Sequence, residues 1–221
     1  MSNELFLSID TSNDYISAAL ADFSGIIDYK EFFTDGKRSE IILELINDLL
    51  KDNNVKTSDV SVFSSSIGPG SFTGIRVGVS TLKGLVFRKN INCIGISSLE
   101  ALAFQNKDVK SVLAPFIVLR NSSVYSSLYL FENDDFNVVS KIKSYSFEDF
   151  IKYVESNKDK CVFIGNKTIN DNSHCLINDY VNAKGVALAS IYYYNKGFKS
   201  TDMDLKPSYY AISQAENDYR K

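Results

Sequence analysis

The fold of this chain follows from one segment, Ile67-Gly68-Pro69-Gly70-Ser71-Phe72-Thr73-Gly74-Ile75-Arg76-Val77-Gly78-Val79-Ser80-Thr81-Leu82-Lys83-Gly84-Leu85. Before it, apolar and small polar residues alternate over 60–66, which predicts a half-buried strand that ends at Gly68. Proline and glycine stop that strand, and Ser71 is suited to cap the helix whose apolar residues then recur at helical spacing. The segment therefore predicts a strand, a tight loop and a helix.

A glycine-rich turn at a helix N-terminus can present backbone N–H groups to a phosphate. Here the candidate residues are Gly68, Gly70 and Ser71. The Lys-Ser/Thr ending of the nucleoside-triphosphate loop and the spacing of the dinucleotide fingerprint are both missing. An ordinary turn between a strand and a helix remains the alternative interpretation.

The helix after this loop contains Gly74, Gly78 and Gly84. Each glycine costs about 0.5–1 kcal/mol relative to alanine inside a helix. Gly74 and Gly78 lie about one turn apart, so they leave a flat strip that another backbone can approach. We expect a close contact with a second helix, either in the same domain or in another protein.

The unbroken run at residues 68–78, Gly-Pro-Gly-Ser-Phe-Thr-Gly-Ile-Arg-Val-Gly, resembles the signature of the bacterial TsaB family, also called YeaZ. The resemblance implies a non-catalytic paralogue and partner of TsaD. That enzyme makes threonylcarbamoyladenosine beside the anticodon of tRNAs that read codons beginning with adenosine. It also implies an α/β, actin-like ATPase (ribonuclease H-like) fold with two subdomains.

The order of the predicted elements fits that fold. The first half is expected to contain strands at 4–9, 15–21, 26–33, 60–66 and 91–96 and helices at 39–51, 73–88 and 98–105. The second half is expected to contain strands at 112–119, 124–131, 136–145 and 161–165 and helices at 146–155 and 185–198. Ser39 and Ser146 are the expected caps of their helices. A boundary near 106–110 predicts subdomains at 1–107 and 108–221, with a polar and partly mobile tail from Thr201.

Composition limits the remaining function classes. The chain has 221 residues, 44% of them hydrophobic, and a formal charge of -3 without a long basic block. A protein that grips RNA by itself usually shows a basic footprint, so we expect tRNA contact only through a complex. Cys93, Cys161 and Cys175 form no C-x-x-C pair and are expected to be buried, reduced thiols. We expect no leader and no membrane span, because residues 1–4 lack the basic start of a leader and no apolar run approaches membrane-spanning length. A cytoplasmic protein is expected.

Catalytic and metal-ligating residues are scarce. Asp10-Thr11-Ser12 ends the first strand, where actin-like folds hold metal-bound phosphate, although an Asp there is more often a turn or cap residue. TsaD-like enzymes carry two histidines on the helix that begins here near Ser98. Ser98 and Leu102 stand at those positions, and neither replaces an imidazole ligand. The one histidine, His174, precedes Cys175 in a polar loop and is not expected to be catalytic. We therefore expect no metal and no catalytic residue.

Three segments depart from the TsaB pattern. Residues 118–125 keep an arginine, a valine and a tyrosine of the family's Asp-Ala-Arg-x-Gly-Glu-Val-Tyr but lose both carboxylates. Arg38-Ser39-Glu40 replaces His-Ser-Glu, and residues 207–211 end in alanine where relatives have arginine. Roles of those carboxylates, or of a terminal arginine, do not carry over.

The leading hypothesis is a scaffold subunit that binds and activates TsaD, with TsaE and tRNA joining through the complex. The expected partner interface consists of apolar and glycine positions on the two helices 39–51 and 73–88: Ile42, Leu45, Leu49, Gly74, Ile75, Gly78 and Leu82. By resemblance, the same face could form a homodimer, and ATP or ADP, if bound, would lie at the junction with the partner. The alternatives are a nucleotide-dependent phosphotransferase or ATPase using Asp10, Thr11, Ser12 and residues 68–71, and a glycopeptidase.

Overall fold

The computed structural model describes residues 4–34, 36–119, 122–133, 135–165 and 176–210. It contains two mixed β-sheets and the helices that pack on them. The first sheet contains β1 (Leu5–Asp10), β2 (Tyr15–Asp22), β3 (Gly25–Phe33), β4 (Val60–Gly68) and β5 (Asn92–Ser97). The second contains β6 (Leu113–Val118), β7 (Ser123–Ser126), β8 (Tyr129–Glu132), β9 (Asp135–Val138), β10 (Lys143–Ser146), β11 (Val162–Gly165) and β12 (Leu176–Asn178). The helices are α1 (Arg38–Asp52), α2 (Phe72–Val86), α3 (Ser98–Gln105), α4 (Phe147–Asn157) and α5 (Ala183–Asn195), with a short 3-10 turn at Thr57–Asp59.

The strand order of the first sheet is β3-β2-β1-β4-β5. Strands β1, β2 and β3 pair antiparallel because short turns join them, whereas β1, β4 and β5 pair parallel because α1 and α2 form the crossovers. The second sheet again joins parallel strands (β6, β11, β12) to antiparallel ones. This topology is the actin-like ATPase fold that the sequence predicted.

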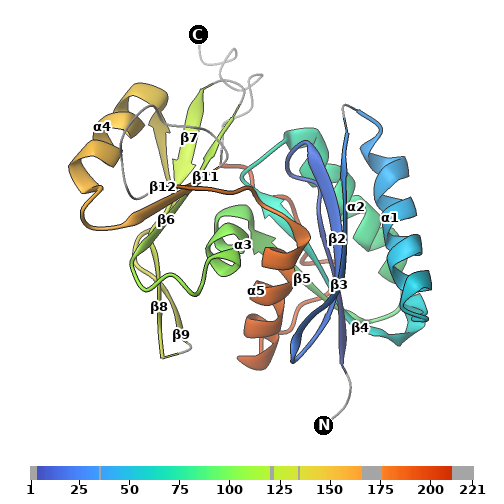
Figure 1. Ribbon diagram of the computed structural model, residues 1–221. Coiled ribbons are helices and arrows are strands. Elements are labelled where there is room, and N and C mark those ends of the chain that lie inside the picture. The colour runs from blue at the N-terminus through green and yellow to red at the C-terminus, as the bar shows by residue number, and fades with distance from the viewer. Residues whose placement is uncertain (1–3, 35, 120–121, 134, 166–175, 211–221) are drawn as a thin grey trace.

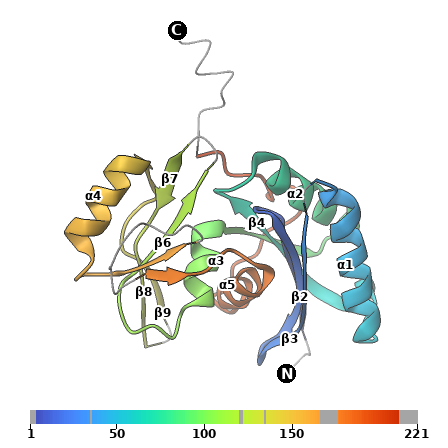
Figure 2. The same ribbon diagram turned by 45° about the horizontal axis from the view of Figure 1, so that its top comes forward.

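The elements form layers (Figure 1). Helices α1 and α2 cover one face of the first sheet, α3 and α5 lie between the two sheets, and α4 covers the outer side of the second sheet, as the turned view also shows (Figure 2). Helix α5 follows the second sheet in sequence but packs on the first sheet and on α3, where Gly185 closely approaches the carbonyl of Ala101. The division into subdomains at 1–107 and 108–221 stays a prediction.

Several local expectations can be compared with the structure. Ser71 and Ser146 cap their helices, since their Oγ atoms accept hydrogen bonds from Gly74 N (3.2 Å) and Asp149 N (3.1 Å). The prediction for Ser39 is wrong, because α1 begins at Arg38 and its N-cap, Lys37, makes no side-chain cap bond. The expected strands 124–131 and 136–145 are each broken in two, where Ser127 Oγ donates to Ser140 O (2.6 Å). Strand β12 was not predicted.

Residues 200–210, here called the C-terminal strap, return to the first sheet. Ser200 O accepts a hydrogen bond from Cys93 N (2.9 Å), and Ser208 N donates to Ile67 O (2.8 Å). Between these points Leu205 is buried in the core shared by the first sheet, α1 and α2. The segment from Thr201 to Ser208 therefore packs against the first sheet, the mobility of the predicted tail stays a prediction, and residues 211–221 lie outside the described chain.

Candidate functional site

The end of β1 and the loop before α2 are hydrogen-bonded to each other. Thr11 Oγ1 donates to Gly74 O (2.7 Å), and Ser71 N donates to Ser12 O (2.7 Å). Thr11 and Ser12 are both buried. The loop therefore directs its polar groups toward the strand end rather than toward solvent.

Glycine makes this contact sterically feasible. A Cβ atom on Gly74 would lie 1.9 Å from Thr11 O, and one on Gly78 would lie 2.5 Å from Thr11 Oγ1. At the loop, a Cβ on Gly70 would lie 2.8 Å from Ser12 O. The prediction that Gly74 and Gly78 face a second helix is wrong. Both face Thr11, the residue that follows β1, because the first turns of α2 pack against the end of that strand.

Asp10 is the buried charge of the site. Its carboxylate accepts hydrogen bonds from Ser66 Oγ, from Ser12 N (3.3 Å) and from Asn13 Nδ2 (3.0 Å). Burial raises the pKa of Asp10 to about 6, and the hydrogen bonds from Ser66 and Ser12 oppose part of that rise. Strongly perturbed pKa values cluster at functional sites, so Asp10 is a candidate functional residue.

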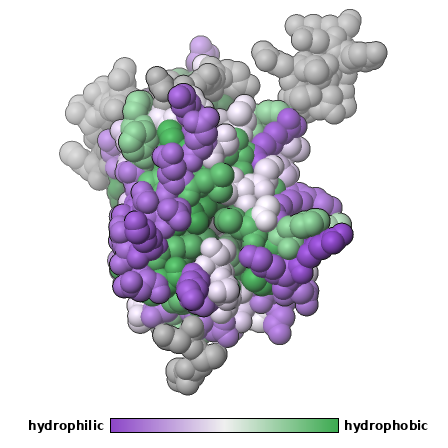
Figure 3. Space-filling model, turned by 90° about the vertical axis from the view of Figure 1, so that its right-hand side faces the viewer, coloured by the Kyte–Doolittle hydropathy of each residue, from purple (hydrophilic) through white to green (hydrophobic). Residues whose placement is uncertain are grey.

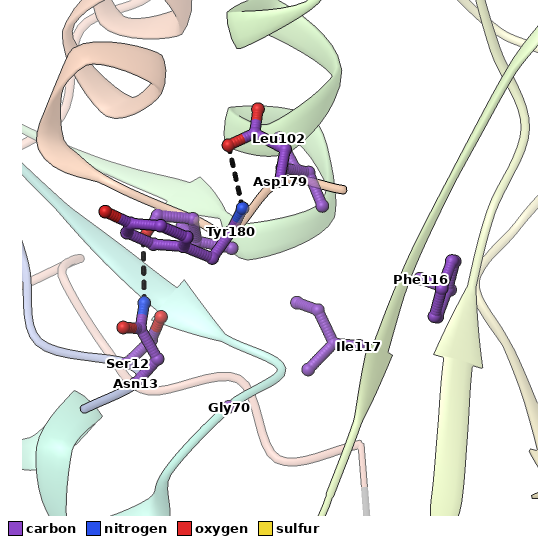
Figure 4. Close-up of a pocket in the computed structure, with 9 residues that line it drawn as sticks. Ser12, Asn13, Gly70, Leu102, Phe116, Ile117, Asp179 and Tyr180 are labelled. Carbon is purple, nitrogen blue, oxygen red and sulfur yellow. Dashed lines mark hydrogen bonds between the residues drawn. The ribbon is translucent and has the colours of Figure 1, made fainter. Parts of the chain in front are cut away.

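A narrow cleft is lined by Ser12 and Asn13, the two residues that follow Thr11 and hydrogen-bond to Asp10 (Figure 4). Asn13 Nδ2, which binds Asp10, also donates to Val181 O (2.7 Å), so the strand end is tied to the segment that leads into α5. The cleft is lined by Ser12, Asn13, Gly70, Leu102, Phe116, Ile117, Asp179, Tyr180 and Val181, with a cavity volume of about 20 Å³. That is room for about one water molecule, whereas small-molecule sites usually measure about 300–1,000 Å³.

The structure brings together five of the six predicted phosphate-loop residues: Asp10, Thr11, Ser12, Gly70 and Ser71. Gly68 is turned toward the C-terminal strap instead, with φ at +113° and room only for hydrogen beside Ser208 O. The backbone N–H of Ser71 is already bound by Ser12 O. Phosphate binding here stays a prediction, and it would require these internal hydrogen bonds to be exchanged.

The positions aligned with the TsaD histidines lie inside the molecule. Ser98 and Leu102 are buried, and Leu102 lines the cleft. Across the described ranges, no three His, Cys, Asp or Glu side chains are grouped so that they could hold a metal ion. His174 and Cys175 lie outside those ranges, whereas Cys93 and Cys161 are buried as expected.

The seven predicted interface residues lie on α1 and α2. Six of them pack between the helices and the first sheet, and Leu45 is half-buried: the buried ones are Ile42, Leu49, Gly74, Ile75, Gly78 and Leu82. Because these six residues are buried inside the subunit, a partner that binds to α1 and α2 would contact the side chains on the outward side of the two helices instead. The interface itself stays a prediction.

Sequence reasoning missed the residues that connect the site to the rest of the chain. The sequence analysis did not single out Ser66, Asn13 or the segment around Val181. Their residue types are common in strands and loops, and their contacts with the site are made across the fold. Tyr209 was also missed, although its ring packs 5.2 Å from that of Phe72, between ring centroids. Pro207, two residues before Tyr209, and the family's terminal motif were the available signals.

Comparisons with known proteins show which proteins the chain resembles in sequence and in fold. Residues 34–172 match the family model TsaD, tRNA N6-adenosine threonylcarbamoyltransferase. The tRNA threonylcarbamoyladenosine biosynthesis protein TsaB of Bacillus subtilis (strain 168) is 28% identical over 81% of this chain and 77% of its own length. The protein of the same name from Haemophilus influenzae is 32% identical over 58% of this chain and 54% of its own. The solved structure of YeaZ from Pseudomonas aeruginosa superposes with a TM-score of 0.77 at 18% identity, covering 93% of this chain and 99% of that one.

The fold and the match to the TsaD family model, which spans more than half of the chain, thus define an actin-like protein related to TsaD. Within that class, the chain belongs to the TsaB (YeaZ) family, as the run at residues 68–78 indicated.

Proposed function

We propose that this chain is a non-catalytic scaffold subunit for the threonylcarbamoyladenosine modification of tRNA, and that it acts by binding and activating TsaD. Family membership carries the proposal, and the small volume of the cleft supports it. The curated relatives are named for biosynthesis of this modification, while the cleft lined by Ser12 and Asn13 has a volume of only about 20 Å³. The reaction is therefore assigned to the partner.

The outward side of α1 and α2 is the surface that would bind TsaD. Figure 3 looks onto the side of the molecule that carries these helices and shows apolar atoms along the middle of that face. Half-buried apolar side chains from both helices border the core there, namely Ile41, Leu45, Val77 and Leu85, and Leu43 is 49% exposed. Apolar surface of this kind is typical of protein interfaces.

Gly84 adds a second observation on the same helix. It is exposed, and a Cβ atom placed on it would meet nothing within 4 Å. The subunit alone gives no reason for a helix-destabilising residue at this position. The close approach of a partner's helix would supply one.

The alternative of a phosphotransferase or ATPase is less well supported. It requires Thr11 and the loop 68–71 to bind phosphate, but Thr11 Oγ1 and Ser71 N are engaged with Gly74 O and Ser12 O. It predicts magnesium-dependent ATP turnover by the isolated chain, which calorimetry and a phosphate-release assay would detect. Nucleotide at the junction with TsaD, a competing homodimer and the recruitment of TsaE and tRNA through the complex are further parts of the scaffold proposal.

The test combines binding with a cellular readout. Leu43→Glu together with Gly84→Arg places charge and bulk on the outward face, and should abolish binding to TsaD from the same organism while leaving thermal unfolding nearly unchanged. In a strain that lacks the gene, the wild-type chain should restore threonylcarbamoyladenosine in tRNA, measured by mass spectrometry of nucleosides, and the double variant should not.

The matched control is Val139→Glu, an equally exposed apolar position, 51% accessible, in the second half of the chain. It should bind and complement like the wild type. Full complementation by the double variant would contradict docking on this face, and failure of the wild-type chain to restore the nucleoside would contradict the proposed function.

A further inference from the structure

Three side chains form an exposed cluster at the start of α2. Arg76 lies one turn after Phe72, and its guanidinium carbon is 3.7 Å from the centroid of the Phe72 ring. Arg76 Nε donates a hydrogen bond to the hydroxyl of Tyr209 (3.0 Å), which comes from the C-terminal strap. An arginine stacked on one ring and bonded to another side chain loses most of its rotational freedom before anything binds.

Two contacts hold the strap in place just before Tyr209. Leu205 is 2% exposed in the core, and Ser208 N donates to Ile67 O (2.8 Å), one residue before the glycine-rich loop. The approach is so close that Gly68 could not carry a Cβ atom beside Ser208 O. Tyr209 is thus a fixed part of the surface of α2, although it lies 133 residues from Arg76 in the sequence.

The cluster remains open to a binding partner. Phe72 and Tyr209 are 49% and 56% exposed, so about half of each side chain faces solvent. Within the described chain, no carboxylate lies within 4.0 Å of Arg76, although four other basic side chains have one. Because Nε is engaged with Tyr209, the terminal N–H groups of the guanidinium remain to bind a planar acceptor in a bidentate manner.

We propose that Phe72, Arg76 and Tyr209 form an anchor that binds a carboxylate side chain of the partner protein, with the C-terminal strap completing the docking surface of α2. The inference rests on the proposed function, since the partner is the protein that docks on α1 and α2. A protein carboxylate is favoured over RNA because the chain has a net charge of -3 and no long basic block. Tyrosine and arginine on a pre-organised surface are also the residues that dominate protein interfaces.

The experiment measures, by calorimetry, the affinity of the full chain for TsaD of the same organism. Arg76→Gln should weaken binding about tenfold or more, because it removes both the charge and the bidentate donors. Arg76→Lys should weaken binding about three- to tenfold, since a lysine keeps the charge but not the planar fork. Tyr209→Phe should weaken it about threefold by removing the hydroxyl that orients Arg76.

The matched control is Arg88→Gln, two residues after the other end of α2. Arg88 also lies over a phenylalanine, 5.3 Å from the Phe87 centroid, but the described contacts show no tyrosine hydrogen-bonded to it. Its affinity should stay within about twofold of the wild type, as expected for a charge outside the anchor. All variants should keep the wild-type melting temperature, since the replaced side chains are exposed.

The outcomes separate the two claims. If the wild type binds TsaD and Arg76→Gln binds equally well, the anchor is wrong and the scaffold function stands. If Arg76→Gln binds TsaD normally but binds unmodified tRNA more weakly than the wild type, the cluster contacts nucleic acid and the proposal is also wrong. If the wild type does not bind TsaD, the proposed function fails and the anchor with it.

Discussion

Helix α2 carries three glycines, and the surroundings of the first two differ from those of the third. Gly74 and Gly78 face inward, where an added Cβ would lie 1.9 Å from Thr11 O and 2.5 Å from Thr11 Oγ1. Gly84 faces outward, where an added Cβ would meet nothing within 4 Å. In the subunit, Gly74 and Gly78 are needed because Thr11, the residue after β1, packs directly against α2 and leaves no space for a side chain. Packing inside the subunit gives no such reason for Gly84, which lies on the exposed side of the same helix.

The largest effect is expected from Gly74→Ala. The obstructing atom is a backbone carbonyl that cannot rotate away, and its movement would also disturb the hydrogen bond from Thr11 Oγ1 to Gly74 O. We expect a loss of about 3 kcal/mol or more in the free energy of unfolding, because overpacking and a broken buried hydrogen bond act together. Urea unfolding followed by circular dichroism would measure it. A loss below about 1 kcal/mol would show that α2 can move away from the strand end and would remove the contrast with Gly84.

The inward side of the comparison also includes Asp10, which sits under the same loop. Its pKa in the folded protein is about 6, against an ordinary value of 3.8, so folding favours the protonated form. The folded state is then most stable, as far as this group is concerned, below pH 3.8 and loses stability as the pH rises to about 6. A difference of about two pKa units corresponds to about 3 kcal/mol as an order of magnitude.

Asp10→Asn removes that titration. The variant is less stable by an amount that does not depend on pH, because its amide NH₂ group faces the donor Nδ2 of Asn13. Since the amide does not titrate, this position causes no further loss of unfolding free energy between pH 4 and pH 7. We expect its unfolding free energy relative to the wild type to improve by about 2 kcal/mol from pH 4.5 to pH 7.5, because about a third of the wild-type loss already occurs below pH 4.5. Denaturant titrations at both pH values would measure this difference. Parallel pH curves for the two proteins would mean that Asp10 is not the buried titrating group.

Most of the fold could be predicted from sequence because it follows from local patterns. The strand before Gly68, the cap at Ser71 and the helix 98–105 each depend on residues within one element, and all three were placed correctly. The split of the expected strands 124–131 and 136–145 could not be predicted, since it depends on pairing between Ser127 and Ser140 across the two strands. The burial of Leu205 was missed for the same reason: it depends on a distant sheet.

The candidate site was predicted as a set of residues but not as an arrangement. Asp10, Thr11 and Ser71 were chosen from positions at a strand end and a helix start, and they do lie together. Their hydrogen bonds to one another were not foreseen, because sequence shows which groups are polar but not which partners satisfy them. The glycine spacing likewise indicated a close contact, but only the structure identifies Thr11 as the neighbour of Gly74.

The smallest effect, and the one that tests the outward half of the comparison, is expected from Gly84→Ala. Since the added methyl group meets nothing within 4 Å, the variant should gain about 0.5–1 kcal/mol in unfolding free energy from helix propensity alone. Thermal unfolding of the isolated chain would measure the gain. If a helix of TsaD packs against this position, the same methyl group should weaken the complex, so stability and affinity should change in opposite directions. A variant that is more stable and binds TsaD as well as the wild type would show that Gly84 lies outside the interface, and the outward glycine would then need another explanation.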